Sequence, residues 1–114
     1  MASESDEMPL PPSRKMVRLT VIVKAKDSFK GKPAVDVIIS LLKKAGISGA
    51  TVTHAARGYG ARGVARADIL GLSVNLPTII ETVADKSAIA KVIPEVHGMI
   101  GSNGLITTEE VNVY

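Results

Sequence analysis

The order in which hydrophobic periodicities succeed one another along these 114 residues restricts the fold more than any other feature. From Met16 to Ala25 apolar and polar residues alternate, with the period of two typical of a strand that buries one face. After a polar link, Lys26 to Lys32, the spacing of apolar residues changes to three and four, which predicts an amphipathic helix. Pro33 suits its first position, where a missing N–H costs nothing, and Gly46 suits its end. The apolar stripe consists of Val35, Ile38, Ile39, Leu41 and Leu42.

A similar succession follows in the second half of the chain. Residues Ala50 to Ala56 are rich in β-forming residues and predict a second strand. The glycines and arginines after it predict a mobile loop, and Ala67 to Val74 fits either a short strand or a turn of helix. Pro77 then opens a third strand, Thr78 to Val83, in which the four β-branched residues Thr78, Ile79, Ile80 and Thr82 are followed by Val83.

The last third predicts a helix and a strand. Asp85 is a plausible helix cap, and Pro94 is expected to interrupt and bend the helix that follows. A turn, Gly101 to Gly104, and a final strand, Ile106 to Val113, complete the series. The apolar stripe of this helix consists of Ile89, Val92, Ile93, Val96 and Ile100.

The resulting order, β-α-β-loop-β-α-β, is that of the ferredoxin-like α+β fold, a four-stranded antiparallel sheet with two helices on one face. The other sheet face has to be solvated or covered, and several strands carry Val, Ile or Ala on both faces. With only 3% aromatic residues, the core of one chain is small. We therefore expect a homo-oligomer that covers the open sheet face.

Length and charge limit the class of protein. Residues 1–15 read as a disordered, Pro-rich tail, and residues 16–114 as one domain. Residues 1–13 hold Glu4, Asp6 and Glu7 and no basic residue, so the chain after Ser13 carries 14 basic residues against 8 acidic ones, which favours anionic partners. The chain has no cysteine, so disulfides and thiolate sites are excluded. No apolar run reaches the length of a membrane helix, and we expect a soluble, cytoplasmic protein without membrane insertion.

The Arg- and Gly-rich stretch and the lysines before the first helix are the candidate anion sites. Guanidinium groups suit bidentate phosphate contacts, although a solvated basic loop without a ligand fits the pattern equally well. The run Gly58 to Gly63 spells GxGxxG, but the short segment after it, broken by Gly71, does not suit a dinucleotide fold. A nucleic-acid contact has only Tyr59 for stacking, so nucleic acid is an unlikely partner. The candidate nucleotide-binding residues are Lys30, Lys32, Arg57, Gly58, Gly60, Arg62 and Arg66.

The sequence offers little for metal binding or catalysis. His54 and His97 have no second ligand at metal spacing, and Glu81 has no visible partner carboxylate. The run before the first helix is not a P-loop, because Pro33 stands where the hydroxyl residue belongs. We therefore expect no enzyme activity, no metal and no permanent cofactor.

Several short motifs, in this order, resemble the small PII-like proteins called domain of unknown function 190. The resemblance runs from about Met16 to Val113. It implies a ferredoxin-like subunit in a trimer, similar to PII signalling proteins, which sense adenine nucleotides in clefts between subunits. It also implies that Gly58 to Arg66 corresponds to the PII T-loop, which contacts partner proteins. The motifs are Phe29–Pro33, Gly49–Val52, Gly58–Ala61, Leu76–Pro77 with Ile80–Glu81, and Gly104–Thr107.

This chain departs from PII proteins in the turn after the second helix. Gly101 to Leu105 has no basic residue, so we expect the phosphates to meet Arg57, Arg62 or the lysines Lys30 and Lys32. The function expected is a non-enzymatic trimeric sensor that binds AMP or a relative and reorders its Arg-rich loop for an unknown target protein. The alternatives are a CutA-like ion-binding or metal-tolerance trimer, in which His54 and Glu81 would converge within one chain or across subunits, and an RNA-binding module.

Overall fold

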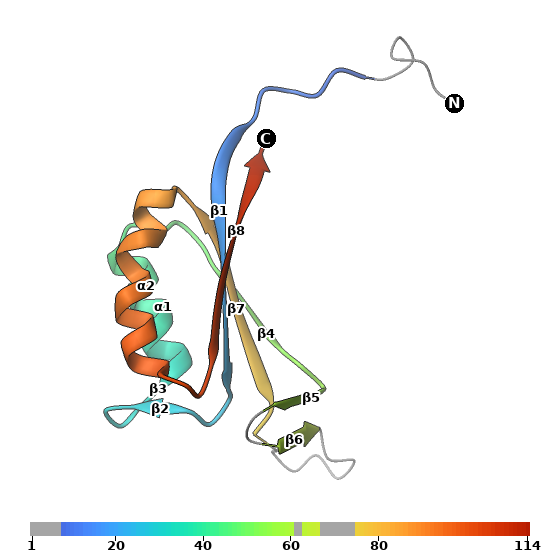
Figure 1. Ribbon diagram of the computed structural model, residues 1–114. Helices are drawn as coiled ribbons and strands as arrows, with labels where there is room; N and C mark the ends of the chain where they lie inside the picture. The colour runs from blue at the N-terminus through green and yellow to red at the C-terminus, as the bar shows by residue number, and fades with distance from the viewer. Residues whose placement is uncertain (1–7, 61–62, 67–74) are drawn as a thin grey trace.

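The structure is a computed structural model that describes residues 8–60, 63–66 and 75–114. In the described residues it contains two helices and a series of strands (Figure 1). The elements are β1 (Arg14–Lys24), β2 (Ser28–Phe29), β3 (Lys32–Pro33), α1 (Ala34–Lys44), β4 (Thr51–His54), β5 (Arg57–Gly60), β6 (Gly63–Arg66), β7 (Pro77–Ala84), α2 (Lys86–Ile100) and β8 (Leu105–Val113).

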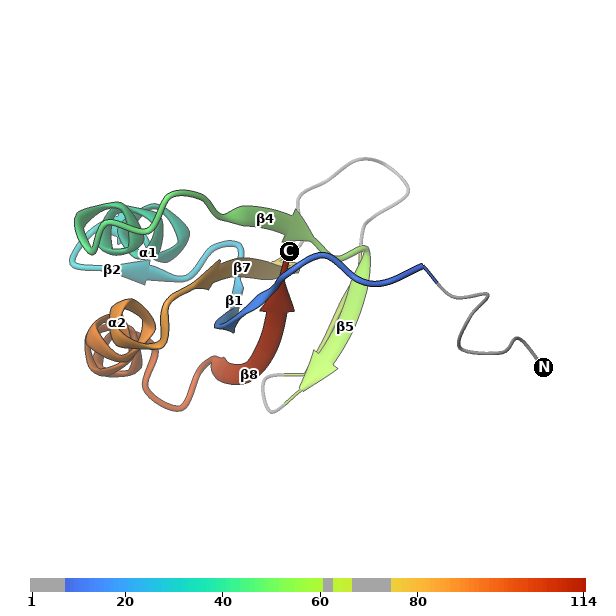
Figure 2. The same ribbon diagram turned by 90° about the horizontal axis from the view of Figure 1, so that it is seen from above.

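Four of the strands form one sheet in the order β4-β7-β1-β8, with every neighbouring pair antiparallel. Both helices cover the same face of this sheet, as Figures 1 and 2 show from two directions. Two further two-stranded sheets are formed by β2 with β3 and by β5 with β6. The predicted ferredoxin-like fold is confirmed.

The core lies between the sheet and the helices, and β1 shows why. Its alternating residues Val17, Leu19, Val21 and Val23 are buried against the helices, as the period of two predicts. The cross-strand partners of Val21 are also apolar, since it pairs with Ile80 on one side and Ile106 on the other. The helices contribute the buried residues Ala34, Ile38, Leu42, Ile89, Val92, Val96 and Ile100.

Two buried threonines fix the edge strand β4 and its approach to the sheet. The hydroxyl of Thr82 donates a hydrogen bond of 2.5 Å to the carbonyl oxygen of Gly49, just before β4. Thr78, which is fully buried, pairs through its hydroxyl with Nδ1 of His54 at 3.2 Å. These contacts satisfy polar groups that would otherwise be costly to bury.

In the described part of the chain, no helix covers the second sheet face. Its centre is polar, because Arg18 of β1 forms an ion pair with Glu109 of β8. Below this centre, the paired residues Ile22, Ile79 and Leu105 form an apolar zone in which Leu105 is 54% exposed. In one chain this face therefore combines a charged centre with an accessible apolar zone.

Both helices bury their predicted apolar stripes, but their N-terminal ends differ from the prediction. Pro33 is the N-cap of α1 and pairs with Ser28 in the β2–β3 hairpin, so it stands one position before the helix. Gly46 follows the C-cap with φ of 81°, as expected of a C-terminal glycine. Asp85 is the N-cap of α2, but its side chain makes no capping hydrogen bond and instead accepts one from Arg14 at 3.3 Å.

Pro94 does not interrupt α2, which continues to Ile100. The backbone nitrogen of a proline cannot donate to the carbonyl four residues earlier, here that of Ala90. Ala90 and Pro94 both lie on the exposed side of the helix, where water can satisfy that carbonyl. The prediction of an interruption was therefore wrong.

The loop prediction is wrong for the residues of β5 and β6, which pair as an antiparallel hairpin, with Arg57 opposite Arg66 and Gly60 opposite Gly63. The polar link before the first helix also contains a short hairpin, β2–β3. The ambiguous stretch Ala67 to Val74 lies outside the described residues. β1 begins at Arg14, so it takes in two residues that the sequence placed in the tail.

Candidate functional site

The described part of the chain contains a cleft of about 650 Å³ at the end of the sheet where β1 ends and β7 and β8 begin. Three parts of the chain surround it: the ends of the sheet strands, the start of the β5–β6 hairpin, and the turn between α2 and β8. The lining residues used below are Ile22, Lys24, Arg57, Gly58, Pro77, Ile79, Ser102, Asn103, Gly104 and Leu105.

The floor of the cleft is the apolar zone of the open sheet face. Strand register places Ile22 between Ile79 of β7 and Leu105 of β8. Lys24, on the same face of β1, ends the ladder opposite Pro77 and is the lysine among the residues that line the cleft. An apolar floor with a few polar groups at its border is the usual composition of a site for a small organic molecule.

The wall formed by β5 depends on a close backbone approach. A Cβ atom built on Gly58 would lie 2.7 Å from Cγ of Pro77, closer than real Cβ atoms come. The neighbouring Ala55 donates a backbone hydrogen bond of 2.9 Å to the carbonyl of Pro77. Glycine at position 58 therefore allows the hairpin to start directly on the proline ring.

The turn after α2 makes an equally close approach on the other side of the cleft. A Cβ atom on Gly104 would lie 2.7 Å from the carbonyl oxygen of Ile22 and 3.0 Å from Cδ1 of Ile100. Asn103 donates a backbone hydrogen bond of 2.9 Å to the carbonyl of Ile100, which closes the turn. The turn is thus held against the last part of β1.

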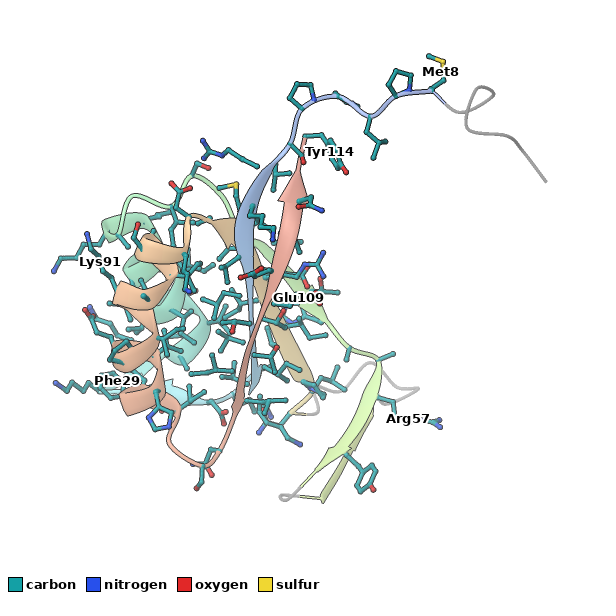
Figure 3. All side chains as sticks on the ribbon, turned by 45° about the horizontal axis from the view of Figure 1, so that its top comes forward. Met8, Phe29, Arg57, Lys91, Glu109 and Tyr114 are labelled. Carbon is teal, nitrogen blue, oxygen red and sulfur yellow. The ribbon has the colours of Figure 1, made fainter. Side chains whose placement is uncertain are left out.

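The structure brings together only some of the candidate residues from the sequence. Arg57 and Gly58 line the cleft, whereas Gly60 lies further along β5. Figure 3 shows the Arg57 side chain extending away from the sheet. The backbone of Arg66 pairs with that of Arg57, and Arg62 lies outside the described residues.

Lys30 and Lys32 lie elsewhere, in the β2–β3 hairpin beside α1. This hairpin is on the helix side of the sheet and the β5–β6 hairpin is on the opposite side (Figure 2). Lys30 has φ of 51°, and its Nζ lies 5.3 Å from the centroid of the Phe29 ring. Within one chain these two lysines do not reach the cleft.

Sequence reasoning missed the contribution of Lys24 and of the turn residues Ser102 to Gly104. Lys24 reads as one more polar residue on the outer face of a strand. The turn is recognisable in the sequence, but its lack of a basic residue argued against a role in binding. The signal that could have identified it is the antiparallel order of the strands, which places the start of β8, and the turn before it, next to the end of β1.

Within one chain, the arrangement does not favour an ion site built from His54 and Glu81. His54 pairs with Thr78 on the helix side of the sheet, whereas Glu81 pairs with Thr20 and Thr51 on the open face. Successive residues of a strand point to opposite faces, so the two side chains of one chain do not converge. No group of three or more His, Cys, Asp or Glu side chains suited to a metal is found among the described residues.

In the described residues no helix is both long and apolar enough to cross a membrane. The helices are 11 and 15 residues long, below the length that a bilayer core requires.

Solved structures with this fold include PII-like proteins. The chain is similar to CPII, a nitrogen regulatory PII-like protein from Thiomonas intermedia bound to ADP, AMP and bicarbonate, with a TM-score of 0.73 at 14% identity over 90% of this chain and 91% of the other. It is also similar to a putative PII-like signalling protein from Thermus thermophilus, with a TM-score of 0.65 at 17% identity over 89% and 91% of the two chains. At these identities the likeness establishes the fold.

The sequence itself matches the family model DUF190, described as Uncharacterized ACR, over residues 16–113. A UPF0166 protein from Methanocaldococcus jannaschii is 45% identical over 96 residues, which cover 84% of this chain and 89% of the relative. The resemblance drawn from the short motifs is confirmed, and the chain belongs to the DUF190 (UPF0166) family.

Proposed function

We propose that this protein is a PII-like sensor that binds an adenine nucleotide, AMP or a relative, and acts by binding rather than by catalysis. In this proposal three copies assemble through their open sheet faces. The nucleotide occupies the cleft beside Arg57 and Gly58, and binding reorders the Arg- and Gly-rich loop segment, residues 57–66. The loop segment then changes its fit to a target protein.

The observation that carries the proposal is the composition of the cleft. Its volume of about 650 Å³ lies within the range of small-molecule sites, which is roughly 300–1,000 Å³. The apolar floor suits a purine ring, and Lys24 and Arg57 at the border suit phosphate oxygens. The CPII structure with the same fold was bound to ADP, AMP and bicarbonate, which supports a nucleotide as the ligand.

A trimer is supported by the character of the open face. Apolar residues around Ile22 and a charged centre at Arg18 remain accessible in one chain. Burial of apolar surface would stabilise association, and the charged centre would select the register between copies. Because Lys30 and Lys32 lie away from the cleft of their own chain, they can contribute to a site only from a neighbouring copy.

The mechanism needs only a small energy difference. A nucleotide that bridges Lys24 and Arg57 favours one position of the β5 strand relative to β1. A preference of about 1.4 kcal/mol for one state shifts its population tenfold, and one or two charge-assisted hydrogen bonds supply this amount. The ligand binds and leaves reversibly, so no permanently bound cofactor is required.

Calorimetric titration of the full chain with AMP, ADP, ATP and cyclic AMP tests the proposal, together with light scattering. We expect saturable heat from at least one nucleotide and a particle of about three times the 11.9 kDa chain mass. No heat from any of the four at millimolar ligand, or a lone 11.9 kDa particle, would refute it. Affinity for RNA that falls steeply with salt would favour the RNA-binding alternative instead.

A further inference from the structure

One side chain, that of Asn75, connects the end of the loop region to the exit of β1. Its Oδ1 accepts a hydrogen bond of 2.7 Å from the backbone N–H of Lys26. Next to it, the carbonyl of Leu76 accepts a hydrogen bond of 2.8 Å from the backbone N–H of Ala25. The β1–β7 ladder itself ends one pair earlier, at Lys24 opposite Pro77.

Asn75 therefore extends the attachment between these two strands beyond the point where backbone pairing stops. A carboxamide oxygen can take the place of a backbone carbonyl as acceptor, and asparagine is the residue that commonly does so in irregular segments. A hydrophobic side chain at this position would leave the N–H of Lys26 without this acceptor. The contact has no part in the core, since Lys26 is exposed and Asn75 is half-buried.

Pro77, two residues after Asn75 in the chain, connects this contact to the cleft. Pro77 accepts the backbone hydrogen bond of Ala55 and lies directly under Gly58. The cleft is bordered on one side by Lys24, which closely precedes the segment held by Asn75, and on the other by Gly58. Asn75 thus attaches to β1 the part of the chain that lies two residues before the proline under Gly58.

We propose that Asn75 is a positioning residue that sets the separation of Lys24 and the Arg57–Gly58 pair across the cleft. It acts through the backbone of Lys26 and through Pro77, and it does not contact the ligand. Its effect on ligand affinity rests on the proposed function, whereas its effect on the position of Gly58 does not.

The experiment uses the full chain and three variants. Asn75→Ala removes the acceptor, Asn75→Asp keeps an oxygen acceptor at the same place, and Lys26→Ala keeps the backbone donor while it removes the neighbouring side chain. Hydrogen exchange at the amide of residue 26 reports the contact. The amide resonance of Gly58 reports the position of β5, calorimetry with ADP and with AMP reports affinity, and thermal unfolding reports the fold.

We expect Asn75→Ala to accelerate exchange at the Lys26 amide, to shift the Gly58 resonance and to weaken nucleotide affinity about fivefold, the size of effect that one hydrogen bond supports. The unfolding midpoint should stay near that of the parent chain. Asn75→Asp should restore amide protection and the Gly58 resonance, and Lys26→Ala should match the parent chain in every readout.

Unchanged protection of the Lys26 amide in Asn75→Ala would overturn the inference, as would lost protection with an unmoved Gly58 resonance. If the parent chain binds nucleotide, an equal affinity of Asn75→Ala would also overturn the inference. If the parent chain binds neither nucleotide, the proposed function fails, and the exchange and resonance measurements still decide the role of Asn75.

Discussion

The β2–β3 and β5–β6 hairpins are both short and basic, and both contain glycine, yet they occupy opposite sides of the sheet (Figure 2). The β2–β3 hairpin lies beside α1 with Lys30 over the Phe29 ring. The β5–β6 hairpin starts on Pro77 at the border of the cleft. The comparison teaches that basic charge near glycine marks possible anion sites, while the surrounding strand ends decide which of them adjoins a cavity.

The largest expected difference between the hairpins is in nucleotide affinity. Arg57→Ala should weaken ADP binding by about 2 kcal/mol, or about thirtyfold, because a hydrogen bond between charged groups is lost. The double variant Lys30→Ala/Lys32→Ala should change affinity less than about twofold, because neither lysine reaches the cleft of its own chain. Calorimetry measures both. A comparable loss in the double variant would show that a neighbouring copy brings its β2–β3 hairpin to the site.

Substitution of the glycines in the two hairpins should also have different effects on ADP affinity. Gly58→Ala places a Cβ 2.7 Å from the ring of Pro77, so β5 has to move away from the cleft border. We expect about tenfold weaker ADP binding, equal to about 1.4 kcal/mol, with little change in the unfolding midpoint, because the hairpin lies outside the core. Gly98→Ala is the matched control, since a Cβ there meets nothing within 4 Å. Equal affinities of the two variants would contradict this account of the border.

Sequence reasoning succeeded where the signal is local and failed where it depends on register. The alternation in β1 and the stripes of both helices follow from the period of burial along a single element, so Leu19, Ile38 and Val96 could be placed in the core. The β5–β6 hairpin was missed because glycine weakens the strand signal, even where pairing partners exist.

The cleft could not be found from spacing, because its parts are far apart in the sequence. Ile22, Ile79 and Leu105 meet only once the register of three strands is known. Lys24 has no local feature that separates it from other exposed lysines. Arg57 and Gly58 could be singled out because charge and glycine are visible in composition, whereas the contact of Gly58 with Pro77 required coordinates.

A smaller effect is expected from the glycine of the other hairpin. Gly31 has φ of 81°, and a Cβ atom placed there would meet nothing within 4 Å, so its requirement is one of backbone conformation and not of space. Gly31→Ala should lower the free energy of unfolding by about 1 kcal/mol, the cost of a left-handed L-residue, and leave ADP affinity unchanged. Chemical denaturation and calorimetry measure the two quantities. An affinity loss like that expected of Gly58→Ala would place β2–β3 in the site.

The smallest expected effect concerns Lys30, which among the described residues is the one non-glycine with positive φ. Lys30 and Gly31, with φ of 51° and 81°, are the two central residues of the β2–β3 hairpin, a geometry that prefers Asn-Gly. Lys30→Asn should relieve the backbone but also lose the contact with Phe29, whereas Lys30→Gln loses the contact alone.

The difference between these two variants isolates the backbone preference, because both lack the ammonium group over the Phe29 ring. We expect Lys30→Asn to be more stable than Lys30→Gln by about 0.5 kcal/mol in chemical denaturation, since asparagine tolerates the left-handed region better than other non-glycine residues. Equal stabilities would mean that the hairpin tip is not under backbone strain. In that case only its position would distinguish Lys30 from the residues of the cleft. Lys30 lies on the helix side of the sheet, away from the cleft beside Arg57.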